Sequence, residues 1–406
     1  MPDTFADMWR QLEPVARDAS TGGYHRFAWT RADAELREWF TGQAVARGLD
    51  VVHDRGGNLW AWWGDPDADG PGVVLGSHLD SVPDGGAFDG PLGVVTAFAA
   101  LDALREKGSV PQGPVGIACF SDEEGARFGI ACAGSRLITG GLDPDRARGL
   151  RDADGVTMAE AMAAAGHDPA HLGPDDDTLR RVGTFVELHV EQGRGLVDAG
   201  AGVGVASSIW PHGRWRLDLA GRADHAGTTR LADRDDPMLA LAQAIQTART
   251  AAERHHALAT IGKLTVHPGG VNAIPSRVTA WLDARGPHAD DVRLVVDDVA
   301  RAAGVDAVEE SWTPDTAFDA GLRDRLAATL GGVPVLPTGA GHDAGILAAA
   351  GIRSAMLFVR NPTGVSHSPA EHADEADCLA GVHALAAVLD DLASPAGMTG
   401  TGSALP

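Results

Sequence analysis

The sequence predicts an α/β protein: a catalytic domain with a mostly parallel central sheet flanked by helices, and an inserted α+β domain. Three observations support this fold class. Short apolar segments alternate with helical ones up to about residue 207, as in a parallel sheet. Segments of strand periodicity and two long helices follow, and the α/β alternation then returns. The 406 residues also exceed what one core usually spans. We expect a catalytic domain at 1–207 and 316–392, an inserted domain at 208–315, and a disordered tail at 393–406.

Four apolar segments of the predicted catalytic domain have the length and composition of buried strands. They are Gly72–Ser77, Val115–Phe120, Thr184–Glu191 and Ala355–Val359, and predicted helices follow at Leu92–Gly108 and Gly321–Leu330. The third segment alternates apolar with polar residues, the period of a strand. The stretch Arg148–Asp177 is either an exposed helical excursion or a variable loop.

The predicted inserted domain combines strands with helices. Alternating segments occur at Gly213–Ala220, Ile261–Val266 and Arg277–Asp283, and helical segments at about Pro237–Ala257 and His288–Ala303. Strands with two helices on one face form a small α+β layer.

Polar side chains follow or end all four predicted strands. They include His78, Asp89, Glu124, His189 and His367. Imidazole and carboxylate ligands suit zinc or manganese, and one bridging carboxylate with two ligands on each side makes a two-metal centre. The alternative is that each histidine caps a helix or bonds a carbonyl group.

Composition excludes several classes of protein. The net charge of −23, with only two lysines, excludes a binder of nucleic acid or of an anionic membrane. An anionic substrate therefore needs a local positive pocket. Three cysteines without a CxxC pair indicate no disulfide framework and favour a reducing cytoplasm. Residues 1–17 lack a signal-peptide core, and no apolar run approaches the ~20 residues that span a bilayer.

Seven motifs, in order, resemble the M20-type metallohydrolases, in the branch of N-carbamoyl-L-amino-acid hydrolases, allantoate amidohydrolases and ureidopropionases. The resemblance extends from about Gly22 to about Leu392. The motifs are GSHLDSVPDGGAFDGPLGV, FSDEEGARFG, ELHVEQG, DHAGTT, GGVNAIPSRV, GAGHDA and GVSHSPAE. ELHVEQG and GAFDGPLGV are typical of this branch and not of ordinary M20 peptidases.

The resemblance implies two divalent metal ions per subunit, Zn²⁺ or Mn²⁺, with Co²⁺ or Ni²⁺ as further options. One ion would be bound by His78, Asp89 and His189, and the other by Asp89, Glu124 and His367, with Asp89 bridging.

The catalytic roles also come from the resemblance. Glu123 would take a proton from water and return it to the leaving nitrogen. Asp80 would fix the tautomer of His78, and its alternative role is that of a simple turn-former.

The resemblance also implies a small anionic N-substituted amino acid as substrate and a homodimer formed by the inserted domain, which closes as a lid. Arg285 and Asn272 match substrate-binding positions, and a guanidinium fork suits a carboxylate. His225 matches a residue that stabilises the tetrahedral oxyanion from the neighbouring subunit. The alternative for Arg285 is a surface ion pair with Asp283.

Glycine-rich backbone offers a further substrate contact. The N–H groups of Gly339 and Ala340 can reach the substrate carboxylate, because glycine permits close approach. The adjacent His342 and Asp343 belong to the same motif and have the alternative role of capping the next helix.

One position departs from the family pattern. His212, in Ile209-Trp210-Pro211-His212, stands where the family has a substrate-contacting Gln, and an imidazole cannot offer the paired donor and acceptor of an amide. An N-formyl or N-formimidoyl amino acid, such as a glutamate derivative, is therefore an alternative to a ureido acid. The sequence is also compatible with a broader aminoacylase or dipeptidase, and with a metal-binding protein without activity. It leaves open the acyl group, the substrate side chain and the metal.

Overall fold

The computed structural model describes residues 2–394, and within this range the chain forms two compact units. Among the described residues, unit 1 comprises 2–207, Ala317–Thr338 and 342–394, and unit 2 comprises Ser208–Thr316 and Gly339–Gly341. The predicted tail lies outside the described residues from 395 onward, and its first residue, Ala393, is still helical. Gly339 and Ala340, expected in the second part of the catalytic domain, belong to unit 2.

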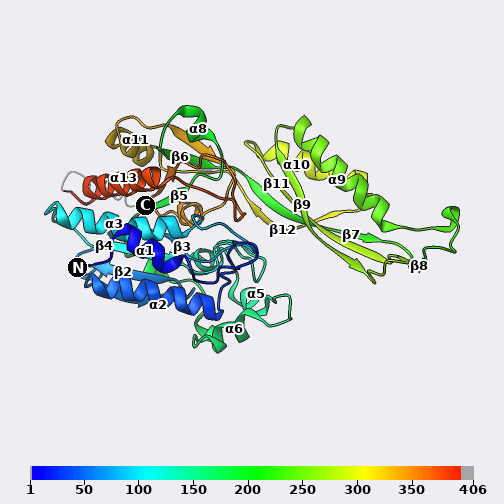
Figure 1. Cartoon of the computed structure of the whole chain (residues 1–406), viewed down its shortest axis with the longest axis horizontal. Helices are drawn as coiled ribbons and strands as arrows, with labels where there is room; N and C mark the ends of the chain where they lie inside the picture. The colour runs from blue at the N-terminus through cyan, green and yellow to red at the C-terminus, as the bar shows by residue number, and fades with distance from the viewer. Residues whose placement is uncertain (1, 395–406) are drawn as a thin grey trace, which may run out of the picture. The chain divides into compact units, whose positions relative to one another are not determined.

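Unit 1 contains most of the helices and the larger sheet (Figure 1). Its helices are α1 (Phe5–Leu12), α2 (Arg31–Ala46), α3 (Pro91–Glu106), α4 (Ala133–Ile138), α5 (Pro144–Gly149), α6 (Met158–Ala164), η1 (Pro169–His171), α7 (Asp176–Leu179), α8 (Gly195–Ala199), α11 (Ala320–Thr329), α12 (Asp343–Ala349) and α13 (Glu375–Ala393). Its strands are β1 (Asp50–His53), β2 (Leu59–Trp63), β3 (Gly72–His78), β4 (Val115–Phe120), β5 (Val182–Val190), β6 (Val203–Ile209), β13 (Thr316–Ala317), β14 (Val335–Thr338) and β15 (Ser354–Val359).

The large sheet has the order β1-β2-β4-β3-β5-β15-β6-β13, and β14 pairs with β6. The central strands β4, β3, β5 and β15 are parallel, while β1, β2 and β6 pair antiparallel with their neighbours. The predicted fold class is confirmed. Because parallel strands end at the same edge, the polar residues after these four strands meet there.

The core of unit 1 lies between the central strands and the helices α3 and α13, which contact each other and the sheet. Leu92, Phe98 and Leu101 of α3 are fully buried, as are Leu75 of β3 and Leu357 of β15. The helix α3 begins at Pro91, whose fixed φ and missing N–H suit the first helical position. This packing fixes the loop before α3, which carries Asp89.

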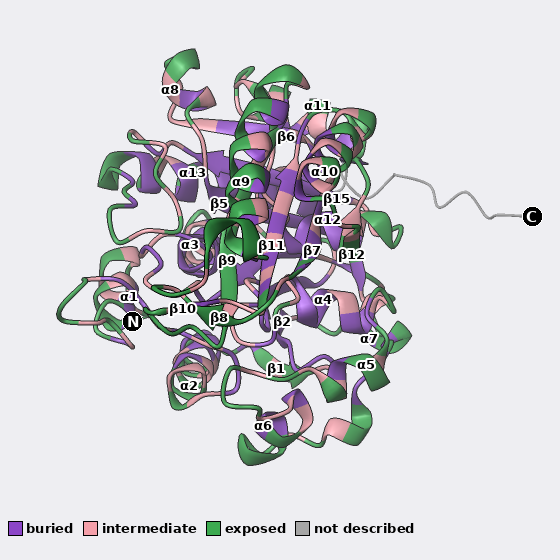
Figure 2. Cartoon of the chain, turned by 90° about the vertical axis from the view of Figure 1, so that its right-hand side faces the viewer, coloured by how far each residue is buried: buried purple, intermediate pink, exposed green. Residues whose placement is uncertain are grey.

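Unit 2 is an antiparallel sheet with two helices on it. Its elements are β7 (His212–Ala220), β8 (Asp224–His225), η2 (Leu231–Asp233), α9 (Pro237–Arg254), β9 (Leu258–His267), β10 (Ala273–Ile274), β11 (Arg277–Arg285), α10 (Ala289–Ala303) and β12 (Ala307–Thr313). The order β12-β7-β11-β9 leaves β9 at an edge, and Figure 2 shows it largely exposed. Strand β11 alternates buried with half-buried residues under α9 and α10, as strand periodicity requires.

Two regions add detail to the sequence-based expectation. Strand β5 alternates apolar with polar residues in its sequence and is buried on both faces except at Gly183. Its polar residues Glu187 and His189 face other buried polar groups, so here the alternation does not follow exposure to solvent. The stretch 148–177 forms the short helices α5, α6, η1 and α7.

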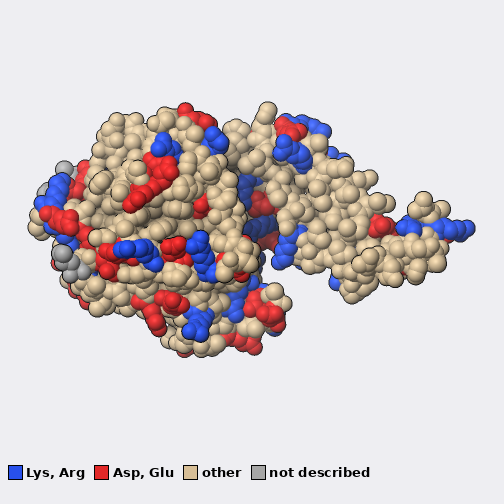
Figure 3. All heavy atoms as spheres, in the orientation of Figure 1, with Lys and Arg blue, Asp and Glu red and all other residues tan. Residues whose placement is uncertain are grey.

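Acidic and basic side chains are interspersed over unit 1 on the face drawn in Figure 3. Surface ion pairs such as Lys107–Asp390 and Arg17–Glu13 contribute to this mixture. No helix among residues 2–394 has the length and apolar character needed to cross a membrane.

Candidate metal centre

The five predicted metal donors meet at the carboxyl edge of the parallel strands. His78 is the last residue of β3, His189 lies near the end of β5, and Glu124 follows β4. Asp89 lies just before α3, and His367 lies in the segment after β15. Residues that are up to 289 positions apart in the sequence, counted from His78 to His367, are therefore neighbours because their strands are.

The first group of donors consists of His78, Asp89 and His189, all buried. Asp89 Oδ1 lies 3.6 Å from Nε2 of His78 and 3.2 Å from Nε2 of His189. The other ring nitrogens face carbonyl oxygens: Nδ1 of His78 lies 3.2 Å from Asp80 O, and Nδ1 of His189 lies 2.9 Å from Val190 O. A proton on each Nδ1 leaves Nε2 as a lone-pair donor for a metal.

The second group consists of Asp89, Glu124 and His367. Nε2 of His367 lies 3.4 Å from Asp89 Oδ2 and 3.5 Å from Glu124 Oε2. His367 adopts a left-handed backbone conformation (φ 54°), which is uncommon for a residue other than glycine.

Both groups fit divalent cations. Within each group, the three ligand atoms lie within 4.8 Å of one another. Nε2 of His78, Nε2 of His189 and Oε1 of Glu124 are buried and make no hydrogen bond, which is costly for a polar atom unless something else binds it. Nitrogen and oxygen donors suit zinc or manganese.

Asp80 organises the backbone beside these groups. Its Oδ1 accepts a hydrogen bond from Glu123 N (3.1 Å), and its Oδ2 accepts one from Glu124 N (3.0 Å). Oδ1 also lies 3.4 Å from Nδ1 of His78, whose hydrogen bond goes to the carbonyl oxygen of Asp80. Asp80 thus fixes the turn that carries Glu123 and Glu124, in addition to lying beside the imidazole.

Glu123 is buried next to the first group. Its Oε2 lies 3.7 Å from Nε2 of His78, and the thiol of Cys132 donates to its Oε1 (3.3 Å). Burial raises the pKa of Glu123 to about 7; the charge of His78 opposes this shift, and Asp80 adds to it. A carboxylate with a pKa near neutrality can both accept and return a proton at physiological pH.

Burial and neighbouring charges also shift the pKa values of the metal donors. Burial and the charge of Asp89 hold the pKa of Glu124 well above its usual value. Burial lowers the pKa of His189, but the nearby carboxylate of Asp89 outweighs burial and raises that pKa to about 9. Several carboxylates that share a water-poor site make a cation favourable there.

The predicted substrate residues of unit 2 fall into two clusters. In the first, Arg285 at the end of β11 lies opposite His212 at the start of β7. The guanidinium of Arg285 makes a bidentate pair with Asp283 (2.8 and 2.7 Å) and donates to Gly339 O (2.9 Å). The ion pair with Asp283 was the alternative role expected for Arg285 from the sequence. A guanidinium group has five N–H donors, so these three hydrogen bonds leave two N–H groups for other acceptors.

The second cluster is the exposed ribbon of β8 and β10. His225 pairs with Ala273 there, and Asn272 O accepts a hydrogen bond from Ala226 N (2.9 Å). The ribbon follows the far end of β7, whose nine residues separate it from His212. At ~3.3 Å per residue, the two clusters are roughly 25 Å apart.

Three side chains around Asp89 were not predicted to act at the site: Gln192, Ser366 and Glu371. Gln192 Nε2 and Ser366 Oγ donate to Asp89 Oδ2 (2.9 and 3.1 Å), and Glu371 Oε1 accepts from Asp89 N (2.9 Å). The sequence motifs could have pointed to these three residues, because Gln192 lies in ELHVEQG, and Ser366 and Glu371 lie in GVSHSPAE.

The chain matches peptidase family M20/M25/M40 over residues 74–391. It is 36% identical to the N-carbamoyl-L-amino acid amidohydrolase of Geobacillus stearothermophilus, covering 93% of this chain and 96% of that protein. It is 31% identical to the allantoate amidohydrolase of Escherichia coli, covering 92% and 93%. A hydantoinase/carbamoylase family amidase from Burkholderia vietnamiensis has a similar crystal structure, with a TM-score of 0.88 at 29% identity, covering 96% and 97%. These matches confirm the resemblance in the motifs, and the chain belongs to peptidase family M20/M25/M40.

Proposed function

We propose that this chain is a metal-dependent amidohydrolase that cleaves a linear C–N bond of a small N-carbamoyl amino acid or of allantoate. The observation that carries the proposal is a pair of donor groups that share Asp89, with the buried Glu123 beside them. The names of the similar amidohydrolases from Geobacillus stearothermophilus and Escherichia coli support the substrate class.

The donors have distinct roles in this proposal. His78 and His189 would hold one divalent ion, Glu124 and His367 the other, and Asp89 would bridge them. Zn²⁺ and Mn²⁺ suit these donors best, and Co²⁺ or Ni²⁺ are further options. When bound, two such ions would polarise the scissile carbonyl group and lower the pKa of a water molecule.

Glu123 moves the proton. Its carboxylate would accept a proton from the attacking water and then deliver it to the leaving nitrogen, so that the C–N bond breaks to give an amine. Asp80 keeps Glu123 in place through the hydrogen bond to its backbone N–H. In the metal-free protein, burial raises the pKa of Glu123 to about 7, which favours a carboxyl group that can hold a proton as well as release it.

The spacing within unit 2 favours a homodimer in which both subunits serve each active site. Arg285 would bind the substrate carboxylate, together with the backbone of Gly339 and Ala340. A small substrate cannot also reach His225 or Asn272 of the same subunit, roughly 25 Å away by the ~3.3 Å rise per residue of a strand. His225, as the oxyanion-stabilising residue, and Asn272 would therefore both come from the second subunit.

His212 favours a second candidate, the hydrolysis of N-formyl or N-formimidoyl amino acids. Its Nδ1 faces Trp210 O (2.9 Å), and this local contact orients the ring. Each nitrogen of an imidazole serves as either a donor or an acceptor, whereas the amide of the usual Gln offers a donor and an acceptor side by side.

A substrate panel tests the proposal. The chelator-treated protein is reconstituted with Zn²⁺ or Mn²⁺ and given N-carbamoyl, N-formyl, N-formimidoyl and N-acetyl amino acids, dipeptides and allantoate. We expect chelation to abolish hydrolysis, metal to restore it, and ureido substrates to be preferred. Preference for formyl or formimidoyl substrates supports the second candidate, and hydrolysis of acetyl substrates or dipeptides alone contradicts both.

A further inference from the structure

The orientation of one carboxylate decides whether both donor groups can form. Asp89 directs Oδ1 toward the two buried histidines of the first group and Oδ2 toward the imidazole of the second. Asp89 lies in a loop, and a carboxylate in a loop turns freely unless neighbouring groups hold it. What holds Asp89 therefore controls the geometry of both groups at once.

Glu371 holds the backbone of this loop. Its Oε1 accepts hydrogen bonds from Phe88 N (2.8 Å) and Asp89 N (2.9 Å). The loop approaches so closely that a Cβ atom at Gly86 would lie 2.4 Å from the same oxygen. Glu371 is only 5% exposed, and a buried carboxylate is tolerated when hydrogen bonds satisfy it. Here the backbone amides of the loop supply those bonds.

Ser366 and Gln192 lie against the side chain of Asp89. The hydroxyl of Ser366 lies 3.1 Å from Asp89 Oδ2 and 3.2 Å from Glu371 Oε2, and its single hydrogen can be donated to only one of these carboxylates at a time. Gln192 Nε2 donates to Asp89 Oδ2 (2.9 Å) and to Ser366 Oγ (3.3 Å). Gln192 is therefore the donor that contacts the carboxylate itself, whereas Glu371 contacts the backbone of the loop.

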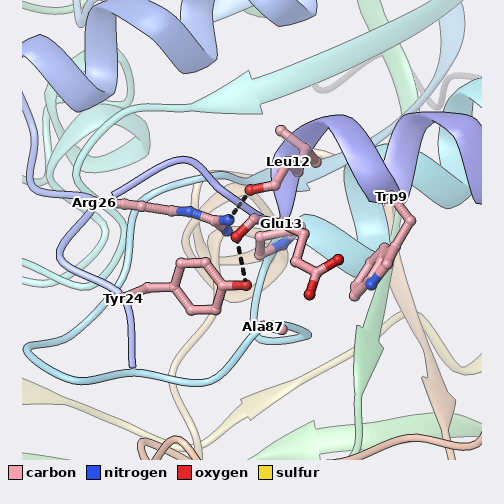
Figure 4. Close-up of a pocket in the computed structure, with 7 residues that line it drawn as sticks. Trp9, Leu12, Glu13, Tyr24, Arg26 and Ala87 are labelled. Atoms are coloured by element: carbon pink, nitrogen blue, oxygen red, sulfur yellow. Dashed lines mark hydrogen bonds between the residues drawn. The ribbon is translucent and has the colours of Figure 1, made fainter. Parts of the chain in front are cut away.

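Aromatic packing supports the same loop from α1. The ring of Phe88 lies 4.9 Å from that of Trp9 and 6.0 Å, edge-on, from that of His372. Figure 4 shows how the end of α1 is anchored beside Ala87: the guanidinium of Arg26 donates to Leu12 O, and the hydroxyl of Tyr24 donates to Glu13 O. The loop is therefore held on both sides, with its hydrogen bonds directed to Glu371.

We propose that Glu371 is a positioning residue that sets Asp89 as the shared ligand of both metal groups, acting through the backbone of the loop that carries it. This inference rests on the proposed function only in that the two donor groups bind metal ions. Loss of Glu371 leaves the N–H groups of Phe88 and Asp89 without this acceptor and releases the loop that carries Asp89. Metal affinity should then fall in both groups.

Metal titration of the whole, chelator-stripped protein tests the role of Glu371. The binding of Zn²⁺ and of Mn²⁺ is measured by calorimetry for the original chain, Glu371→Ala and Glu371→Gln. Removing a group that orients a metal ligand typically lowers affinity by about 10- to 100-fold, and we expect this for Glu371→Ala. Glu371→Gln keeps an acceptor oxygen for both N–H groups and should bind metal nearly as tightly as the original chain.

Two controls separate positioning from stability. Glu375→Gln changes an exposed carboxylate four residues along the chain and should bind metal normally. Asp102→Asn weakens the ion pair with the buried Arg47 (2.7 Å), and should lower the unfolding temperature without lowering metal affinity. Equal metal affinity in the original chain and in a folded Glu371→Ala protein would overturn the inference. If the original chain itself binds neither ion, the proposed function fails instead.

Discussion

The metal donors of unit 1 and the substrate-binding candidates of unit 2 differ in how they are held. His78, Asp89 and His189 are buried, and each is hydrogen-bonded by backbone or neighbouring side chains. His225 and Asn272 are exposed, on a two-stranded ribbon. The candidate metal donors and Glu123 thus lie together within one unit, whereas the candidate substrate residues of unit 2 fall into two separate clusters.

The largest effect is expected at Glu123. Glu123→Gln keeps the shape and the backbone bond to Asp80 but cannot take a proton, so kcat should fall by ~10²–10⁴-fold. Metal content should be unchanged, because Glu124 remains. Steady-state kinetics at full metal occupancy measure this, with Glu375→Gln as the matched control. A kcat close to that of the original chain would remove Glu123 from the mechanism.

A complementation experiment tests whether the exposed ribbon serves a second subunit. His225→Ala and Glu123→Gln proteins should each be nearly inactive, since each lacks one essential group per site. After subunit exchange, half of the dimers are mixed and carry one intact site each, so about one quarter of full activity should return. If mass spectrometry verifies exchange and activity stays at the parental level, His225 acts within its own chain or not at all.

A smaller effect on kinetics is expected at Arg285. The experiment also distinguishes two roles of this residue: binding the substrate carboxylate, or pairing only with Asp283. Arg285→Lys keeps the charge but loses the bidentate fork, which costs about 1–3 kcal/mol of substrate binding. KM should rise more than kcat falls. The exposed Arg249→Lys is the control. A lower unfolding temperature with an unchanged KM would mean that Arg285 only pairs with Asp283.

The smallest effect is expected at His212. His212→Gln restores the usual residue of the family and should shift relative kcat/KM toward N-carbamoyl amino acids or allantoate, over N-formyl and N-formimidoyl ones, by several-fold. The exposed His171→Gln serves as the control. Identical substrate ratios in both variants would show that position 212 does not contact the acyl group.

The sequence predicted the fold class and the grouping of the five donors because both follow from local patterns. An apolar strand followed by His78 or by Glu124 is visible within ten residues, and parallel pairing brings such ends together. The hydrogen bond from Asp89 N to Glu371 was not predicted, since the two residues are 282 positions apart in the sequence. The partners of the polar residues in β5 were also not predicted: Glu187 accepts hydrogen bonds from Ser77 Oγ (2.8 Å) and Ala344 N (2.9 Å), which lie far from it in the sequence.

The inserted unit was expected from its periodicity, but the separation of its functional residues was not. The sequence placed Arg285, Asn272 and His225 in one domain. Only the register of β7 against β11, with Arg285 opposite His212 and Arg277 opposite Ala220, shows that these residues lie at opposite ends of a strand pair. Register depends on the whole sheet, which short motifs do not encode.

Metal stoichiometry tests the central claim most directly. Elemental analysis of the reconstituted, active protein should give two divalent ions per chain. His367→Ala should retain about one, because only the second group loses a ligand, and Asp89→Ala should lose affinity for both, because the two groups share that carboxylate. A fully active protein with one ion or none, or an Asp89→Ala protein that still binds two ions tightly, would contradict the account.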